Sequence, residues 1–118
     1  MNYKFTTKYK ENIKDDAKAD SRARANFVRK IVFDNLYTFD DSEIKNGRKP
    51  KTKHNVKIEG ISLNDEDYEL ISKISSHYNM TVTKLVSFIV NQYYENKINK
   101  HIPKLLLFEE KSIGNHKD

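Results

Sequence analysis

Apolar and polar positions form their clearest pattern between residues 56 and 96. From roughly Lys57 to Leu63 they alternate, which predicts a short strand. Apolar residues then recur twice at helical spacing, so the pattern predicts one strand followed by two helices. The predicted apolar faces are Leu70, Ile71, Ile74 and Tyr78 on the first helix, and Val82, Leu85, Val86, Ile89, Val90 and Tyr93 on the second.

Polar residues mark the ends of both predicted helices. Asn64 precedes the first helix and can accept a hydrogen bond from the N–H groups of its first turn. Acidic residues, which the positive end of the helix dipole favours, follow at 65–67. Asn79 tolerates the left-handed conformation that ends a helix, and Thr81 can cap the second helix.

One strand and two helices of about forty residues cannot bury a core alone. A single strand also leaves its backbone N–H and C=O groups without partners. A second unit of the same kind would supply an antiparallel strand and two further helices. We therefore expect this unit to be paired.

The unit at 56–100 resembles the ribbon-helix-helix family of DNA-binding proteins in the lengths of its strand, helix, turn and helix. The resemblance covers about a third of the chain, and the matching segments are Ile61-Ser62-Leu63-Asn64-Asp65-Glu66-Asp67 and Asn79-Met80-Thr81-Val82-Thr83-Lys84-Leu85-Val86. It implies a mainly α fold with a short β-ribbon, in which two β-α-α units pair as a dimer or as two tandem halves. It also implies that the ribbon enters the major groove of double-stranded DNA.

The first forty residues carry a related pattern 58 positions earlier. Tyr3-Lys4-Phe5-Thr6 falls on Ile61-Ser62-Leu63-Asn64, and Ile13 falls on Ile71. Phe27, Val28, Ile31 and Val32 fall on Leu85, Val86, Ile89 and Val90. One hypothesis is two halves in tandem. The alternative is an N-terminal arm followed by one helix from Arg22 to Tyr37, since Asp16 and Asp20 fall on apolar positions.

The chain therefore divides into residues 1–37, a linker at 38–55, the unit at 56–100 and a C-terminal segment at 101–118. The linker contains Asn46-Gly47 and Pro50, which form loops. The last helix is expected to end between Asn96 and Lys100, before Pro103. Leu105-Leu106-Leu107-Phe108 either packs against the body or forms a surface for a partner.

The net charge of +5 is gathered in two places. Residues 1–30 carry nine basic and four acidic residues, and residues 45–57 carry six basic and no acidic residues. This distribution indicates a polyanionic partner, although a solvated loop would also explain the second cluster.

Candidate base contacts follow from the alternation within the strands. With Ile61 and Leu63 facing the core, Gly60 and Ser62 face outward, and Ile58 joins them if the alternation is unbroken. A bulge at Gly60 would instead turn Lys57 and Glu59 towards the DNA. In the tandem arrangement Asn2 and Lys4 form the outward face of the partner strand. The candidates are thus Asn2, Lys4, Lys57, Glu59, Gly60 and Ser62.

Candidate phosphate contacts lie at the starts of the second helices and in the linker. The N–H groups there can hold a phosphate, and basic side chains add charge. The linker can track phosphates or enter a minor groove, or it only connects the halves. The candidates are Ser21, Arg22, Arg24, Thr81, Val82, Thr83 and Lys84 at the helix starts, and Arg48, Lys49, Lys51 and Lys53 in the linker.

Catalysis is not expected. The four histidines show no ligand spacing, and the three glycines form no phosphate-binding loop, so no metal or other cofactor is predicted. The lack of cysteine excludes disulfides and fits a reducing cytoplasm. No apolar run is long enough to span a membrane.

The resemblance implies several possible roles. We favour a plasmid DNA-processing accessory protein that marks a conjugative transfer origin as part of a relaxosome, together with a relaxase or another plasmid protein. An autoregulatory transcriptional repressor or a centromere-binding partition factor is the near alternative. A protein–protein interaction module is the alternative of another class. A homo-oligomer is also expected.

Overall fold

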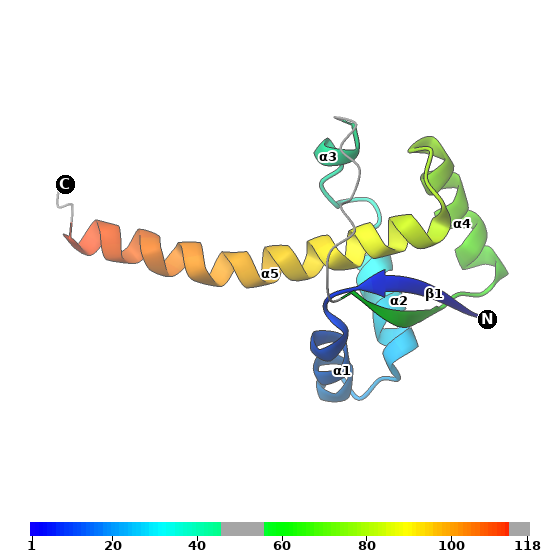
Figure 1. Cartoon of the computed structure of the whole chain (residues 1–118), viewed down its shortest axis with the longest axis horizontal. Helices are drawn as coiled ribbons and strands as arrows, with labels where there is room; N and C mark the ends of the chain where they lie inside the picture. Colours follow the sequence, from blue (N-terminus) through cyan, green and yellow to red (C-terminus); the bar gives the residue numbers. More distant parts are fainter. Residues whose placement is uncertain (46–55, 114–118) are drawn as a thin grey trace.

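A computed structural model describes the backbone of residues 1–45 and 56–113 and the side chains of residues 1–45 and 56–99 (Figure 1). The described part is mostly helical with one two-stranded antiparallel sheet. In chain order the elements are β1 (Asn2–Thr7), α1 (Lys10–Ala19), α2 (Arg24–Asn35), α3 (Ser42–Lys45), β2 (Lys57–Ser62), α4 (Asp65–His77) and α5 (Val82–Ile113).

The two strands come from the two halves of the chain and pair without interruption. The register runs from Asn2 opposite Ser62 to Thr7 opposite Lys57. It continues through Met1 and Leu63, which exchange backbone hydrogen bonds of 3.0 and 3.1 Å. The strand predicted at 57–63 thus finds its backbone partners within its own chain.

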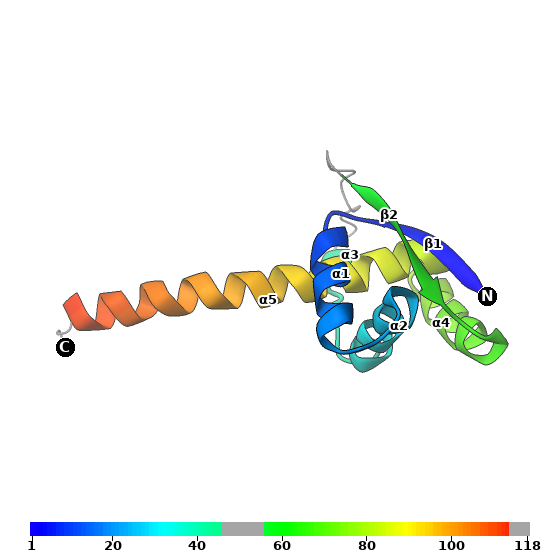
Figure 2. The same ribbon diagram turned by 90° about the horizontal axis from the view of Figure 1, so that it is seen from below.

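Each strand packs on the second helix of the other half of the chain. β1 lies against α5, β2 lies against α2, and α2 and α5 also contact one another. In Figure 1 the ribbon crosses in front of α2 and runs beside α5, and in Figure 2 it lies along the upper edge of the body. Neither half therefore encloses a core of its own.

The buried positions of the two halves follow the same 58-residue spacing. The buried pairs at this spacing are Phe5 and Leu63, Ile13 and Ile71, Ala17 and Ser75, Phe27 and Leu85, Val28 and Val86, Ile31 and Ile89, Val32 and Val90, and Leu36 and Tyr94. The turns between the helices match as well, because Ser21 and Asn79 have φ values of 56° and 57°. Asn79 thereby takes the left-handed conformation predicted for it.

In place of a partly ordered arm, residues 2–7 form β1 and residues 10–19 form α1. Asp16, which falls on an apolar position of the other half, is accommodated by two partners on α5. Its carboxylate accepts a hydrogen bond of 2.9 Å from the Tyr94 hydroxyl and one of 3.3 Å from Lys97 Nζ. Polar partners from the distant helix thus replace an apolar contact.

The first residues of the expected linker are attached to the body. Residues 42–45 form the short helix α3, and Asp40 exchanges two hydrogen bonds of 2.8 Å with the Gln92 side chain on α5. The Tyr78 hydroxyl donates to Asp41, and this bond raises the pKa of Tyr78 to about 12. Residues 46–55 lie outside the described part of the chain.

The expected end of the last helix between Asn96 and Lys100 is wrong, because α5 continues through Pro103 to Ile113. A proline inside a helix removes one hydrogen bond and costs about 3 kcal/mol, which disfavours the helix without forbidding it. The side chains of Leu105-Leu106-Leu107-Phe108 lie outside those described. None of the described helices is long and apolar enough to cross a membrane.

Candidate nucleic-acid interface

The outward face of the ribbon carries six side-chain positions in three facing pairs. Asn2 lies opposite Ser62, Lys4 opposite Gly60, and Thr6 opposite Ile58. Asn2, Lys4, Thr6 and Ile58 are exposed, whereas Gly60 and Ser62 are half-buried. None of the six is acidic, so the face offers small polar groups, one ammonium group and one large apolar side chain.

The structure brings together four of the six predicted base contacts, namely Asn2, Lys4, Gly60 and Ser62. Thr6 belongs to the same face but was not among the predicted contacts, because it falls on Asn64, the predicted cap of a helix. The alternation Asn2, Lys4, Thr6 is the signal that identifies it.

Of the two alternatives for β2, the structure shows the unbroken alternation, with Ile58 on the outward face. The alternative of a bulge at Gly60 is wrong, and Lys57 and Glu59 do not join the outward face. Both lie in the phase of the ribbon's inner side, since the pairing with β1 is continuous. Glu59 is only 6% exposed, and its Oε2 atom lies 3.7 Å from Arg24 Nε on α2. Arg24 offsets the cost of burying this carboxylate, although Glu59 Oε1 has no hydrogen-bond partner among the described residues.

The start of α5 is capped by its own chain. Thr81 Oγ1 accepts a hydrogen bond of 3.2 Å from the Lys84 N–H, which confirms the predicted cap. The N–H groups of Val82 and Thr83 belong to the first turn, which has no acceptors within the helix. The Lys84 side chain is exposed, so these groups can approach an anion together.

The start of α2 carries more positive charge and no side-chain cap. Its N-cap residue, Ala23, makes no side-chain hydrogen bond. Arg22 Nε lies 2.6 Å from Asp20, and Arg24 is held by Glu59. The two arginine side chains are 48% and 43% exposed, so their remaining N–H groups can reach a further partner.

Several hydrogen bonds fix the backbone of the ribbon. Ser87 Oγ on α5 donates to Thr6 O at 2.5 Å, and Lys10 Nζ on α1 donates to Ile58 O at 3.0 Å. Thr7, which is fully buried, donates to Asn91 Oδ1 at 2.7 Å. The outward side chains therefore stand on a ribbon that hydrogen bonds with α1 and α5 hold in place.

An ion pair ties the two halves together below the ribbon. Arg29 on α2 donates two hydrogen bonds of 2.8 Å to the Asp67 carboxylate on α4. Asp67 also closes a capping box with Asn64, which confirms the predicted N-cap. The hydrogen bonds from Arg29 hold the pKa of Asp67 below its ordinary value. No local sequence signal connects residues 38 positions apart, so this pair was not predicted.

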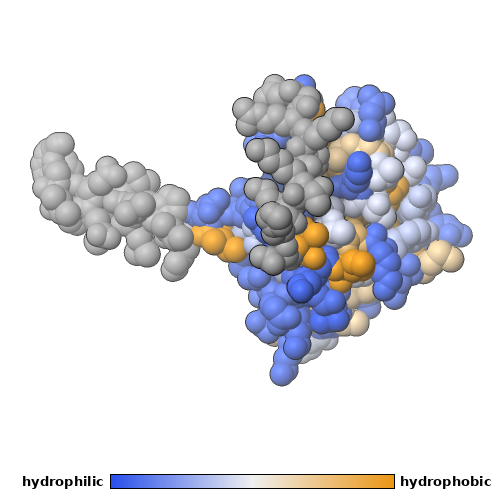
Figure 3. All heavy atoms as spheres, viewed as in Figure 1, coloured by the Kyte–Doolittle hydropathy of each residue, from blue (hydrophilic) through white to orange (hydrophobic). Residues whose placement is uncertain are grey.

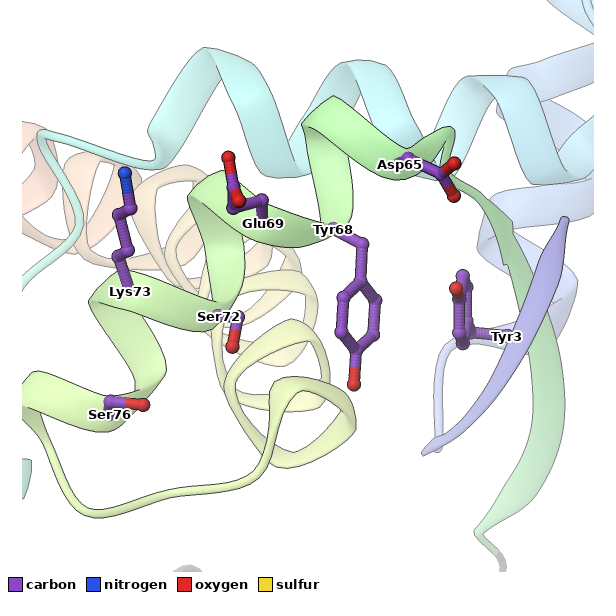
Figure 4. Close-up of a pocket in the computed structure, with 7 residues that line it drawn as sticks. All are labelled: Tyr3, Asp65, Tyr68, Glu69, Ser72, Lys73 and Ser76. Carbon is purple, nitrogen blue, oxygen red and sulfur yellow. The ribbon is translucent and has the colours of Figure 1, made fainter.

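An open hollow lies beside the ribbon and along α4 (Figure 4). Tyr3 and Tyr68 stack at the end of the hollow nearest the ribbon, with ring centroids 4.9 Å apart. The other lining residues are Asp65, Glu69, Ser72, Lys73 and Ser76. It is shallow and mixed in charge. Among the described residues, no three His, Asp or Glu side chains gather to hold a metal ion.

The remaining predicted phosphate contacts, Arg48, Lys49, Lys51 and Lys53, lie outside the described residues. Of the others, Ser21 forms the left-handed turn before α2. On the face shown in Figure 3, hydrophilic residues predominate and hydrophobic residues form smaller separate areas.

Comparison of the chain with protein-family models, with curated proteins and with solved structures finds no match in any of the three.

Proposed function

We propose that this chain is a single-chain ribbon-helix-helix protein that binds double-stranded DNA sequence-specifically through the outward face of β1 and β2. The observation that carries the proposal is the antiparallel ribbon itself, built from two β-α-α halves with the same spacing of buried residues. The major groove is about 12 Å wide and admits such a two-stranded ribbon.

The outward side chains suit the chemistry of base edges. Lys4 can donate to O6 and N7 of guanine, and Asn2 can pair with N6 and N7 of adenine. Ser62 can donate or accept. These side chains stand on two strands whose backbones are already paired with one another. Binding would therefore require little ordering of the ribbon.

Gly60 supports a close approach of the ribbon to the bases. A Cβ atom there would meet only Tyr3 O, at the ordinary contact distance of 3.8 Å. The fold therefore has room for a side chain at Gly60, and glycine within a strand lowers stability. Because Gly60 has no side chain, the outward face does not protrude opposite Lys4. A bulkier residue there would hold the ribbon away from the bases of the groove.

Phosphate contacts at the two helix starts would orient the ribbon. Arg22 and Arg24 flank the start of α2, and Thr81 and Lys84 flank the start of α5. These starts are 58 residues apart in sequence and belong to the two halves, so they would hold the DNA backbone at two places. Such contacts supply affinity without sequence preference.

The test begins with duplexes selected by the full chain from a random pool. Binding is then measured by fluorescence anisotropy with competitor DNA present. Lys4→Ala should weaken binding to the selected duplex by about 5- to 150-fold and relax the preference at one base pair. Lys84→Ala should weaken binding to all sequences and reduce the salt slope by about one unit.

Lys30→Ala is the matched control, because Lys30 is exposed on α2 and paired with Asp34 away from the helix start. It should change neither sequence preference nor salt slope by a comparable amount. A wild-type chain that binds competitor DNA as well as the selected duplex would overturn the proposal. So would a Lys4→Ala chain that keeps the full preference.

For the biological role, we propose an accessory protein at a plasmid transfer origin, acting with a relaxase. The proposal rests on the resemblance and on the presence of both halves in one chain. A repressor or partition factor would use the same interface, and the neighbouring genes distinguish these roles. A protein-interaction module would show no retention on DNA. The expected homo-oligomer remains a prediction, since pairing of the strands needs no second copy.

A further inference from the structure

Ile58 is an exception on the outward face of the ribbon. This residue is 59% exposed to solvent, although isoleucine is usually buried. Its backbone carbonyl accepts a hydrogen bond from Lys10, but the fold makes no comparable use of its side chain. It lies opposite Thr6 and two positions from Gly60, among polar or small residues.

Ile58 also occurs on one side of the ribbon only. Tyr3 lies opposite Ile61, which is 58 positions later, so the approximate two-fold axis that exchanges the halves passes through this pair. The axis exchanges the pair Asn2–Ser62 with the pair Lys4–Gly60. The counterpart of Thr6 is Asn64, which caps α4 and lies outside β2. The Thr6–Ile58 pair therefore has no equivalent on the other side.

The major groove offers one apolar group to such a side chain, the C5 methyl group of thymine. Two residues of a strand advance about 6.6 Å, which is close to two base-pair steps of about 3.4 Å. Ile58 would thus meet the groove about two base pairs further from the axis than the Lys4–Gly60 pair.

We infer that Ile58 reads a thymine methyl group in one half of the DNA target, so that the target is not a palindrome and the chain binds it in one orientation. This inference rests on the proposed function. It adds an apolar contact that distinguishes the two halves of the site.

A protein partner fits Ile58 less well than DNA does. Val56, which is 37% exposed, continues the same phase beyond the strand, but the two side chains are far smaller than a stable protein interface of about 1,000 Å². Lys4 lies on the same face, and Lys10 Nζ lies 3.0 Å from Ile58 O, so the local charge favours a polyanion. Binding of a second copy at Ile58 is therefore an outcome that the experiment must detect.

The test uses a duplex that the full chain has selected from a random pool. Each thymine of the duplex is replaced in turn by deoxyuridine, which removes only the C5 methyl group. For the wild-type chain, replacement at one position should weaken binding about three- to tenfold, which is the effect of one apolar carbon. For Ile58→Ala, the same replacement should change binding less than twofold. The position related to it by the axis of the site should be insensitive in both proteins.

Two further variants keep the result interpretable. Ile58→Thr retains one methyl group and should show an intermediate dependence on the thymine. Ile98→Ala removes another exposed isoleucine, on α5, and should keep the full wild-type dependence. Thermal unfolding of each variant verifies its folding, and sedimentation of the complex reports the number of chains bound.

Equal deoxyuridine losses in the wild-type and Ile58→Ala chains would overturn the inference, as would sensitive thymines on both sides of the axis. An Ile58→Ala chain that lost only cooperative binding of a second copy would overturn it as well. These results leave specific DNA binding intact. A wild-type chain without preference for the selected duplex would instead overturn the proposed function.

Discussion

The two halves of the chain bury the same positions but differ in how their helices begin. In the C-terminal half, α4 starts with a capping box at Asn64 and α5 starts with the Thr81 cap. In the N-terminal half, α1 and α2 have no side-chain caps. The shared geometry therefore comes from the buried positions, because the local helix signals of the two halves differ.

The N-terminal half compensates through contacts with α5. Tyr9 at the start of α1 stacks on Tyr94 with ring centroids 5.4 Å apart, and the Tyr94 hydroxyl donates to Asp16. Burial, followed by this hydrogen bond, raises the pKa of Tyr94. The first half therefore depends on contacts with the second for its stability, while it supplies much of the positive charge at the proposed interface.

The largest effect is expected when the halves are separated. Residues 56–118 alone should fold only as a homodimer, because β2 and α5 lose the partners that cover them. Residues 1–45 alone should remain largely unfolded, since α1 and α2 lack caps. Circular dichroism over a range of concentrations, with sedimentation, measures both. A folded monomer of 56–118 would contradict the shared core.

The second effect concerns the ion pair between the halves. Arg29→Ala should lower the free energy of unfolding by about 1–2 kcal/mol, as the half-exposed Arg29 leaves the buried Asp67 without its partner. Ser87 is the position equivalent to Arg29 in the other half, and Tyr9 is the position equivalent to Asp67. These two residues form no ion pair among the described contacts. Urea unfolding of Arg29→Ala and of Ser87→Ala compares the two sites.

The same pair predicts a dependence on pH. The pKa of Asp67 is lower in the folded than in the unfolded chain, so its stabilising contribution is complete above its unfolded pKa of about 4. That contribution is lost as the pH falls through the folded pKa. Asp67→Asn should therefore be less stable than the wild type at pH 7, and the difference should shrink below pH about 4. A constant difference down to pH about 2 would refute the assignment.

The third effect tests the caps at equivalent positions. Thr81→Ala should lower the free energy of unfolding by about 1 kcal/mol, because the Lys84 N–H loses its acceptor. Ala23→Thr should raise it by about 0.5–1 kcal/mol, since Ala23 already has the extended conformation of an N-cap, with ψ of 145°. If both substitutions lowered stability, α2 would be held by contacts that a cap disturbs.

The smallest effect concerns the left-handed turns. Ser21→Gly should stabilise the protein by about 0.5–1 kcal/mol, because serine has no ready access to φ of 56°. Asn79→Gly should change stability by only a few tenths of a kcal/mol, as asparagine tolerates this conformation. Thermal unfolding of both variants measures the contrast, and equal shifts would show that the two turns are equally strained.

Local chemistry made part of this fold predictable. The Asn64 and Thr81 caps, the turn at Asn79 and most of the apolar positions of α4 and α5 follow from short-range rules, and the structure confirms them. One aromatic was misplaced, because Tyr94 is buried in the core and the predicted Tyr93 is only partly buried. The two-stranded, mainly helical composition follows as well. The 58-residue spacing identified buried positions in both halves because it compares positions rather than propensities.

Contacts between distant residues account for most of what the sequence did not show. The inward position of Glu59 depends on Arg24, which lies 35 positions away, and on uninterrupted strand pairing. The helix α1 depends on partners of Asp16 that lie 78 and 81 positions away. Among the proposed site residues, the alternation along each strand identified those on the outward face of the ribbon. The hypothesis of a bulge at Gly60 wrongly added Lys57 and Glu59 to them.

Because β1 and β2 belong to one molecule, dilution cannot take the ribbon apart. Two segments joined within one chain meet at an effective concentration on the order of millimolar, whatever the copy number in a cell. Assembly of the ribbon is then a first-order process. The fraction of molecules with an assembled ribbon is therefore the same at very low and at high protein concentration. A mutation in one strand would also leave the other unchanged, so the two edges of the ribbon are free to evolve apart.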